Sequence, residues 1–317
     1  KQQMTAVIEC WGSEGYRQTT PALFYETMQA RYADAPEDAE IVATVKKNIE
    51  GYTPALMNNW YLLSFPVDEE PDFQAAGMIT ESNYDLFYFD QDFPGEVEDD
   101  EANGEWRNYK WCMENGEEFK ADYNAYLYAN RRNTTLSFTG ILYTEGTKVY
   151  QRIKYNSDSD QVGVNLIGNP YTCNAEVVTG NRIRGIYMMN DDRTDVMAYD
   201  DSEFDYTYVA PMTAFFAVAA ANNNNAKITM CPVDLDEHEG EEPGVIRSRS
   251  TTRAASSHTP TMSIELTANG VVKDRGYLKA GQGEDCPKFT LTKKGSKIFV
   301  PKDNKNYAIA YAGDANE

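Results

Sequence analysis

A motif that occurs twice constrains this chain more than any other feature of its sequence. Residues 162–173 are VGVNLIGNPYTC, and residues 58–68 are NNWYLLSFPVD. When Pro66 is aligned with Pro170, each copy has a short apolar run that ends at a small residue and then a proline. Because proline has no N–H for a strand ladder, each copy predicts a buried strand that stops at this point.

The segments that follow the motif also occur twice. The matching pairs, in order, are 84–90 with 185–191, 124–130 with 213–219, and 135–139 with 227–230. Four matching strands in one order indicate the tandem duplication of a β module, because repeats of this length are not short solenoid coils. The apolar positions of the motif, which we expect to be largely buried, are Leu62, Leu63, Leu166 and Ile167.

The whole chain predicts a mainly β fold with tandem, related, sandwich-like modules. Strands recur at intervals of roughly 8–20 residues with Gly, Asn and Asp turns between them. The expected parts are an N-terminal strand with a helical cap (1–51), a first β module (52–146), a second β module that repeats the first (147–233), a mobile linker (234–261) and a C-terminal β segment (262–317).

Two helices are expected in the N-terminal cap. Residues 21–33 begin with a proline at a first-turn position, and residues 36–51 have an acidic first turn and two lysines near the end. In the second segment, Ile41, Val45 and Ile49 follow one another at a spacing of four, which is typical of an amphipathic helix.

The linker and the C-terminal segment differ in composition. Residues 234–261 are first acidic and then rich in Arg, Ser and Thr, without an apolar period, which predicts mobility. The strands expected after it are 262–267, 271–279, 287–292, 296–301 and 306–312.

The charge of the chain excludes some partners. The formal net charge is −21; residues 68–122 carry 18 acidic and 3 basic side chains, whereas residues 245–305 carry 5 acidic and 12 basic ones. An acidic body repels phosphate, so we expect no nucleic-acid partner. No apolar run approaches the roughly 18–20 residues that cross a bilayer, so we expect no membrane insertion in this segment.

The ends and the cysteines of the chain carry less information. The sequence opens with Lys1 rather than an initiator methionine, which we interpret as a processed product or an excised piece, so the missing signal peptide says nothing about secretion. The five cysteines are far apart, odd in number and without a CxxC pair. This pattern argues against a disulfide scaffold and against zinc, and it favours free buried thiols.

Several motifs resemble one family. The W-x-L-x-S-x-P and N-L-I-G-N-P-Y signatures, with Y-D-L-x-x-F, A-Y-L-Y-A-N and T-L-S-F-T-G, are similar to a module of secreted and surface-exposed, adhesin-like proteins of Bacteroidetes-type bacteria. The resemblance covers about residues 58–317 and includes 272–278 and 297–301. In that family a Gly-Trp usually precedes the Asn, whereas this chain has Gly163-Val164. The resemblance implies an extracellular β-rich accessory domain and assigns no catalytic residue.

The usual catalytic constellations are missing from the sequence. His238 and His258 are the only histidines of the sequence, both lie in the expected linker, and neither belongs to an HExxH pattern. We therefore expect no enzyme, no cofactor and no catalytic metal. A glycoside hydrolase needs only two carboxylates, so it stays as a distant third alternative.

An acidic loop raises the question of calcium. Residues 90–101 hold seven carboxylates, the kind of hard oxygen ligand that Ca²⁺ prefers. They lack the D-x-D-x-D-G spacing that preorganises a calcium loop, so a solvated surface loop is the favoured interpretation.

Aromatic residues give the one candidate binding site. Trp106, Tyr109 and Trp111 alternate with other residues directly after the acidic loop, and Tyr84 and Tyr88 are expected nearby. Flat rings beside carboxylates can stack on sugars. The competing interpretation places these rings in a sandwich interior, and the usual burial of aromatic residues favours it.

The sequence therefore predicts a monomeric, non-enzymatic adhesion or interaction module on the surface of a bacterium. Its partner would be a host or bacterial surface protein, or a glycan. The alternative is a carbohydrate-binding accessory module of a polysaccharide-degrading system. An exposed stripe containing Trp106 and Trp111 would favour the sugar, whereas a buried stripe beside an exposed apolar patch would favour protein adhesion.

Overall fold

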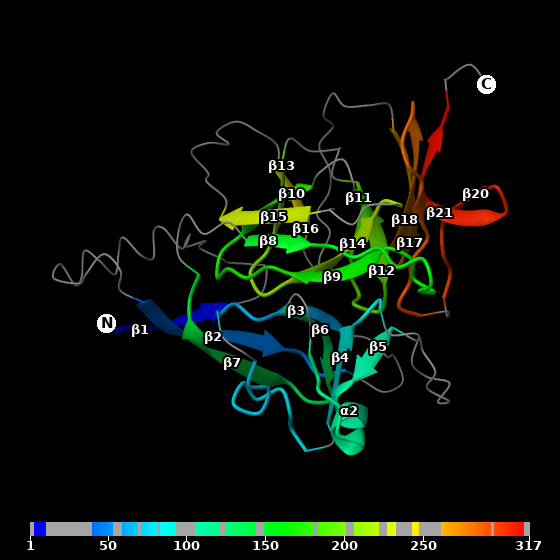
Figure 1. Ribbon diagram of the computed structural model, residues 1–317. Helices are drawn as coiled ribbons and strands as arrows, with labels where there is room; N and C mark the ends of the chain where they lie inside the picture. Colours follow the sequence, from blue (N-terminus) through cyan, green and yellow to red (C-terminus); the bar gives the residue numbers. More distant parts are fainter. Residues whose placement is uncertain are drawn as a thin grey trace.

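The fold is mainly β, as the sequence predicts. In the computed structural model (Figure 1), the first module lies at the bottom, the second module above it, and the C-terminal sheet at the right. The structure describes residues 3–10, 40–52, 59–68, 71–81, 83–92, 105–120, 124–143, 149–179, 183–200, 206–221, 227–232, 243–246, 261–292 and 295–313.

The first module has two sheets. The first outer sheet has the order β1–β2–β7, with β1 (Gln3–Cys10) parallel to β2 (Glu40–Ile49) and β7 (Thr134–Ile141) antiparallel to β2. The first inner sheet has the order β3–β6–β4–β5. Its strands, with the helix that follows β5, are β3 (Tyr61–Ser64), β6 (Ala125–Asn130), β4 (Tyr84–Phe89), β5 (Trp106–Asn108) and α2 (Tyr109–Asn115).

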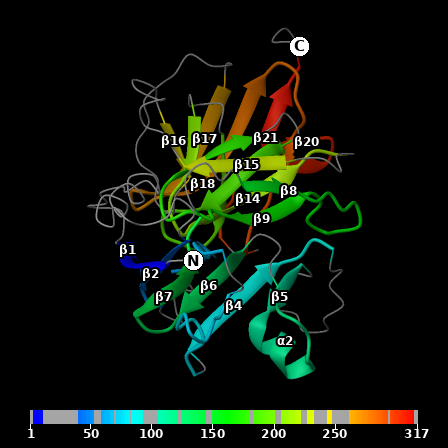
Figure 2. The ribbon, with the colours of Figure 1, turned by 60° about the vertical axis from the view of Figure 1, so that its left-hand side comes forward.

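The second module also has an inner and an outer sheet; Figure 2 labels β9 and β14 of the inner sheet and β8, β15 and β16 of the outer sheet. The second inner sheet has the order β9–β14–β11–β12, with the strands β9 (Val164–Gly168), β14 (Ala214–Ala219), β11 (Ile183–Met189) and β12 (Val196–Tyr199). The second outer sheet has the order β16–β13–β10–β15–β8. Its strands are β16 (Pro243–Ile246), β13 (Tyr206–Val209), β10 (Ala175–Thr179), β15 (Lys227–Pro232) and β8 (Val149–Arg152).

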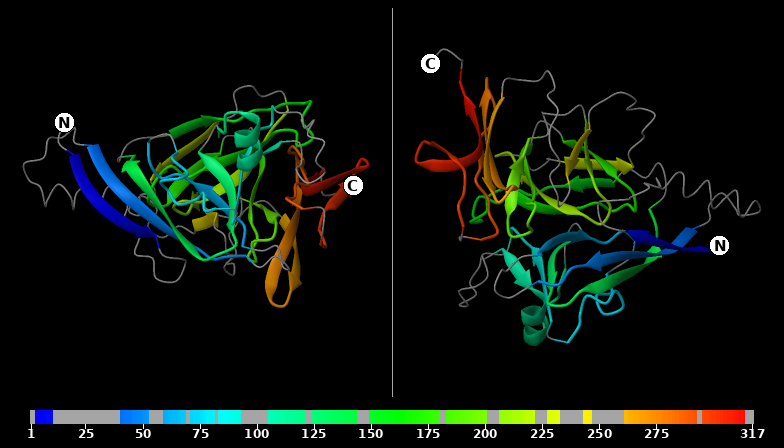
Figure 3. Two further views of the ribbon diagram at one scale, coloured as in Figure 1. Left: turned by 90° about the horizontal axis from the view of Figure 1, so that it is seen from below. Right: turned by 180° about the vertical axis from the view of Figure 1, so that it is seen from behind.

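The C-terminal sheet is built from the last five strands and has the order β17–β18–β21–β19, with β20 paired to β21. The strands are β17 (Thr261–Ala268), β18 (Val271–Ala280), β19 (Cys286–Pro287), β20 (Val300–Lys302) and β21 (Lys305–Ala312). Figure 3 shows the β17–β18 hairpin in orange, projecting from the body of the molecule.

Three apolar cores hold the sheets together. The first core lies between the two sheets of the first module, and the second core lies between the two sheets of the second module. A middle core is shared by both inner sheets and the C-terminal sheet. Each inner sheet is therefore covered on both faces, which explains why its strands are continuous apolar runs.

The motif residues are buried as predicted. Leu62 and Leu166 point into the middle core, whereas Leu63 points into the first core and Ile167 into the second. All four side chains are at most 5% exposed.

The two inner sheets have the same order of equivalent strands, which is what a duplication predicts. Pro66 and Pro170 each follow the equivalent edge strand, β3 or β9. Equivalent hydrogen bonds close these strands: the Phe65 N–H donates to the Asn124 carbonyl at 3.2 Å, and the Asn169 N–H donates to the Thr213 carbonyl at 3.0 Å.

One of the matched segments needs a correction of a single residue. The sequence comparison aligned Leu86 of β4 with Tyr187 of β11, but the sheet registers pair Leu86 with Tyr128 and Ile186 with Ala217, the equivalent position of β14. Leu86 and Ile186 are therefore equivalent, and both point into the core of their own module. A slip of one residue turns every side chain to the other face, so burial decides the alignment.

The helical cap is wrong for residues 40–49, which form β2. A spacing of four is even, so Ile41, Val45 and Ile49 share one face of a strand as well as one face of a helix. β-Branched side chains at five of the ten positions favour the strand. Because β2 pairs with β7, it belongs to the first outer sheet. The helix expected at 21–33 lies outside the described residues.

The expected linker and C-terminal strands also differ in part. Residues 243–246 form β16, which pairs parallel with β13 at the edge of the second outer sheet, so this part of the linker is a strand. Most of the remaining linker lies outside the described residues. In the C-terminal segment, the strand expected at 287–292 is found only at 286–287, and the strand expected at 296–301 is found only at 300–302.

Candidate functional site

The predicted aromatic site is dispersed over two cores. Trp106 lies in β5, is 8% exposed, and packs edge to face against Phe89 and Phe216 in the middle core. Tyr84 and Tyr88 of β4 are buried in the first core, where burial raises the pKa of both phenols. These three rings stabilise the interior and form no stacking platform.

Tyr109 and Trp111 lie on α2 rather than on a strand. The Asn108 side chain caps the helix by accepting hydrogen bonds from the backbone N–H groups of Lys110 (2.8 Å) and Trp111 (3.3 Å). Both rings are half-buried against the first core. The Arg107 guanidinium lies 5.0 Å from the centre of the Trp111 ring. The alternation expected of a strand is therefore broken at Asn108.

The acidic loop is only partly described. Its residues 93–101 lie outside the described residues, and Asp92 forms an ion pair with Lys154 at 2.9 Å. Within the described ranges, no three Asp, Glu, His or Cys side chains are grouped as metal ligands would be. The described helix α2 is too short and too polar to cross a bilayer.

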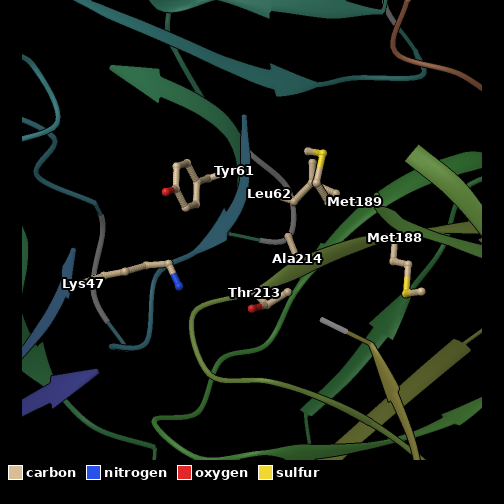
Figure 4. Close-up of a pocket in the computed structure, with 7 residues that line it drawn as sticks. All are labelled: Lys47, Tyr61, Leu62, Met188, Met189, Thr213 and Ala214. Carbon is tan, nitrogen blue, oxygen red and sulfur yellow. The ribbon is translucent and has the colours of Figure 1, made fainter. Parts of the chain in front are cut away.

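A small cavity lies where the two modules meet (Figure 4). Its volume of about 10 Å³ is close to that of one water molecule. The lining residues are Lys47, Tyr61, Leu62, Met188, Met189, Thr213 and Ala214. A cavity of this size cannot hold a sugar ring.

Exposed apolar side chains gather in the C-terminal sheet. Of the five large hydrophobic side chains that are exposed in the described part of the chain, Met262 (59%), Ile264 (46%) and Phe299 (43%) belong to this segment. Met262, Ile264 and the half-buried Leu266 share one face of β17, because side chains alternate along a strand. We call these three residues the β17 surface.

The register of the sheet shows that the β17 surface faces away from the body of the molecule. Ile264 lies opposite Gly276 of β18, and a Cβ at Gly276 would lie only 2.8 Å from the Ile298 side chain. Glycine thus leaves room for Ile298 on the outer face. The neighbouring Tyr277 points to the other face, where it is 2% exposed in the middle core.

Two buried ion pairs stabilise the same sheet. Lys279 of β18 bonds to Asp200 at 2.5 Å, and Lys288 bonds to Asp274 at 2.5 Å. Burial lowers the pKa of Lys288, and it raises the pKa of the Cys286 thiol to about 12. Because the Lys279–Asp200 pair anchors β18 to the second module, the β17 surface is held on a rigid support.

Sequence reasoning placed a strand at 262–267 but did not select it as a site. The signal was available, since Met262, Ile264 and Leu266 alternate with polar residues. What the sequence lacks is the direction in which that face points. No protein-family description, curated protein or solved structure matches this chain.

Proposed function

We propose that this chain is a non-enzymatic adhesion or interaction module of an extracellular bacterial surface protein, and that it contacts its partner through the β17 surface. The observation that carries this proposal is the exposure of Met262 and Ile264 on a sheet whose other face is packed and ion-paired. Apolar groups that stay in water on a rigid strand are typical of a contact surface.

Two further observations favour a protein partner over a sugar. The rings expected to stack on a sugar are buried or half-buried, and the cavity between the modules holds about one water molecule. The extracellular location rests on the resemblance to Bacteroidetes-type surface proteins.

The test is a binding assay against immobilised extracellular-matrix proteins, run beside a glycan array. We compare the wild-type chain with Ile264→Lys and with Val178→Lys. Val178 is the matched control, because it is 50% exposed on β10 in the second module. We expect the wild type and Val178→Lys to bind a protein of the panel, and Ile264→Lys to bind it at least about tenfold more weakly.

Another outcome would overturn the proposal. Binding to glycans alone, lost in Trp111→Ala and kept in Ile264→Lys, would show that the carbohydrate-binding alternative is correct.

A further inference from the structure

β17 is an edge strand with few of the features that block pairing with another chain. No described strand pairs with it on the side away from β18. Edge strands are usually protected by lysine, proline or a bulge. The sequence TMSIELTA contains no lysine or proline, and its one charged residue, Glu265, is bound by Arg275 at 2.8 Å. The single irregularity lies near the end of the strand, between Leu266 and Thr267.

The sequence of β17 is complementary to itself in the antiparallel direction. If Ile264 lies on a two-fold axis opposite its own copy, Met262 lies opposite Leu266 and Glu265 opposite Ser263. All apolar side chains then stay on one face, because the paired positions have the same parity. Aliphatic pairs fill that face, and no two charges of one sign meet.

Neighbouring registers are worse. A register centred on Glu265 brings two carboxylates opposite each other, which is destabilising. A register centred on Ser263 leaves Leu266 opposite Pro260, which is outside the strand in the sequence. A shift by one residue turns the apolar face of one copy away from that of the other.

We propose that two copies of this chain associate through antiparallel pairing of their β17 strands, with Ile264 on the two-fold axis. The dimer joins both C-terminal sheets into one continuous sheet and unites the two β17 surfaces. Because both copies use the same strand for this contact, the assembly is complete as a dimer. The dimer replaces the monomer that we expected from the sequence. It rests on the proposed function only in using the same surface.

The first test measures the mass of the full chain by sedimentation velocity over a concentration series. The wild type and Val178→Lys should form dimers. Ile264→Lys should weaken the dimer at least about tenfold, since it brings two lysines together on the axis. Circular dichroism and the thermal midpoint verify that each variant is folded. A wild-type chain that stays monomeric, or an Ile264→Lys variant that dimerises like the control, would overturn the proposal.

A second test reads the register. In an Ile264→Cys variant the two new thiols are opposite each other, with Cβ atoms about 4.5–5.5 Å apart, so mild oxidation should give a covalent dimer. In Leu266→Cys the new thiols are four residues out of register, about 13 Å apart, and should not be linked. The wild type reports any linkage through native cysteines. Equal linkage of both variants would exclude this register and contradict the proposal.

The outcome also separates this inference from the proposed function. A monomer that binds the protein panel through Ile264 would overturn the dimer and leave the function intact. A dimer that binds no protein of the panel would keep the inference and remove the function.

Discussion

The two modules contact the part of the chain that follows them at equivalent positions but with different chemistry. Asp92 of the first module binds Lys154 of the second at 2.9 Å, and the equivalent Asp192 of the second module binds Lys273 of the C-terminal sheet. Each module thus presents an aspartate after its β4 or β11 strand to a lysine of its successor.

The buried acidic residue of the next turn, Glu105 in the first module and Asp195 in the second, shows the difference in chemistry. Glu105 and Asp195 are equivalent, because their carbonyls accept 2.8 Å hydrogen bonds from Asp90 and Asn190. One oxygen of Glu105 accepts from Ser159 and Gln161, and the other has no hydrogen-bond partner among the described residues.

Asp195 is fully bonded. One oxygen accepts from the N–H groups of Val196 and Leu291, and the other binds the ammonium of Lys297. The equivalent acidic position therefore contacts the next part of the chain in two different ways. Glu105 accepts hydrogen bonds from neutral donors, whereas Asp195 forms a buried ion pair. The second form depends far more on its charge.

The largest expected effect comes from breaking the ion pair between Asp195 of the second module and Lys297 of the C-terminal segment. Asp195→Asn leaves Lys297 in a poorly solvated place without its carboxylate, so we expect a loss of about 3–5 kcal/mol in the free energy of unfolding. Urea unfolding measures it. Asp192→Asn, at an ion pair that is about one-quarter exposed, is the control and should cost about 0–1 kcal/mol. Equal costs would show that burial does not distinguish the pairs.

The duplication can be tested in the middle core. Leu62 and Leu166 are equivalent and are 5% and 3% exposed, so truncation of either to alanine should cost about 2–5 kcal/mol. The urea midpoints of the two variants should fall by similar amounts. A variant with a midpoint close to wild type would show that its strand is peripheral and that the two copies are not energetically equivalent.

Alkaline pH should lower the free energy of unfolding, because the Cys286 thiol is buried in the folded protein. Burial raises the pKa of Cys286 to about 12, from 9.0 in an exposed thiol. Above pH 9 the unfolded thiol loses its proton while the folded one keeps it. The contribution of this thiol to stability is therefore greatest below pH 9 and falls by up to about 1.4 kcal/mol per pH unit between pH 9 and 12.

Urea midpoints measured from pH 8 to 10 would show this fall. Tyr128 and Tyr143, whose pKa burial raises to about 12, add to it above pH 10. Cys286→Ala should reduce the slope between pH 9 and 10. An unchanged slope would place the titrating groups elsewhere.

The smallest effect is expected at Glu105, which accepts hydrogen bonds from neutral donors. Glu105→Gln keeps an oxygen for Ser159 and Gln161 and removes a buried charge, so the unfolding free energy should change by less than about 1 kcal/mol. A loss as large as that of Asp195→Asn would mean that both junctions need the charge.

Much of this fold could be predicted because the apolar pattern is repeated. The alignment of Leu62 and Leu63 with Leu166 and Ile167 predicted the correct strands, the prolines that follow them and the burial of these four side chains. The failures came where a pattern fits two periods. A spacing of four fits both a helix and a strand at Ile41, Val45 and Ile49, and pairing with β7, which is distant in sequence, decides between them.

The site was less predictable than the fold. The sequence groups Trp106 and Trp111 in one expected aromatic stripe, but the cap at Asn108 starts a helix between them, so they do not share a face. Tertiary packing, which no local pattern encodes, also decides that Tyr277 is covered while Ile264 is open.

The middle core has a consequence for the history of the chain. The faces that the two inner sheets turn toward it are equivalent: Leu62 and Leu127 on one side correspond to Leu166 and Phe216 on the other. Contact through the same patch of both copies is the mark of a symmetric homodimer. We infer that a gene for a self-pairing ancestor was duplicated and fused, so that an encounter between molecules became a permanent contact within one. A first module produced alone, residues 1–146, should therefore self-associate, and a soluble monomer would argue against this origin.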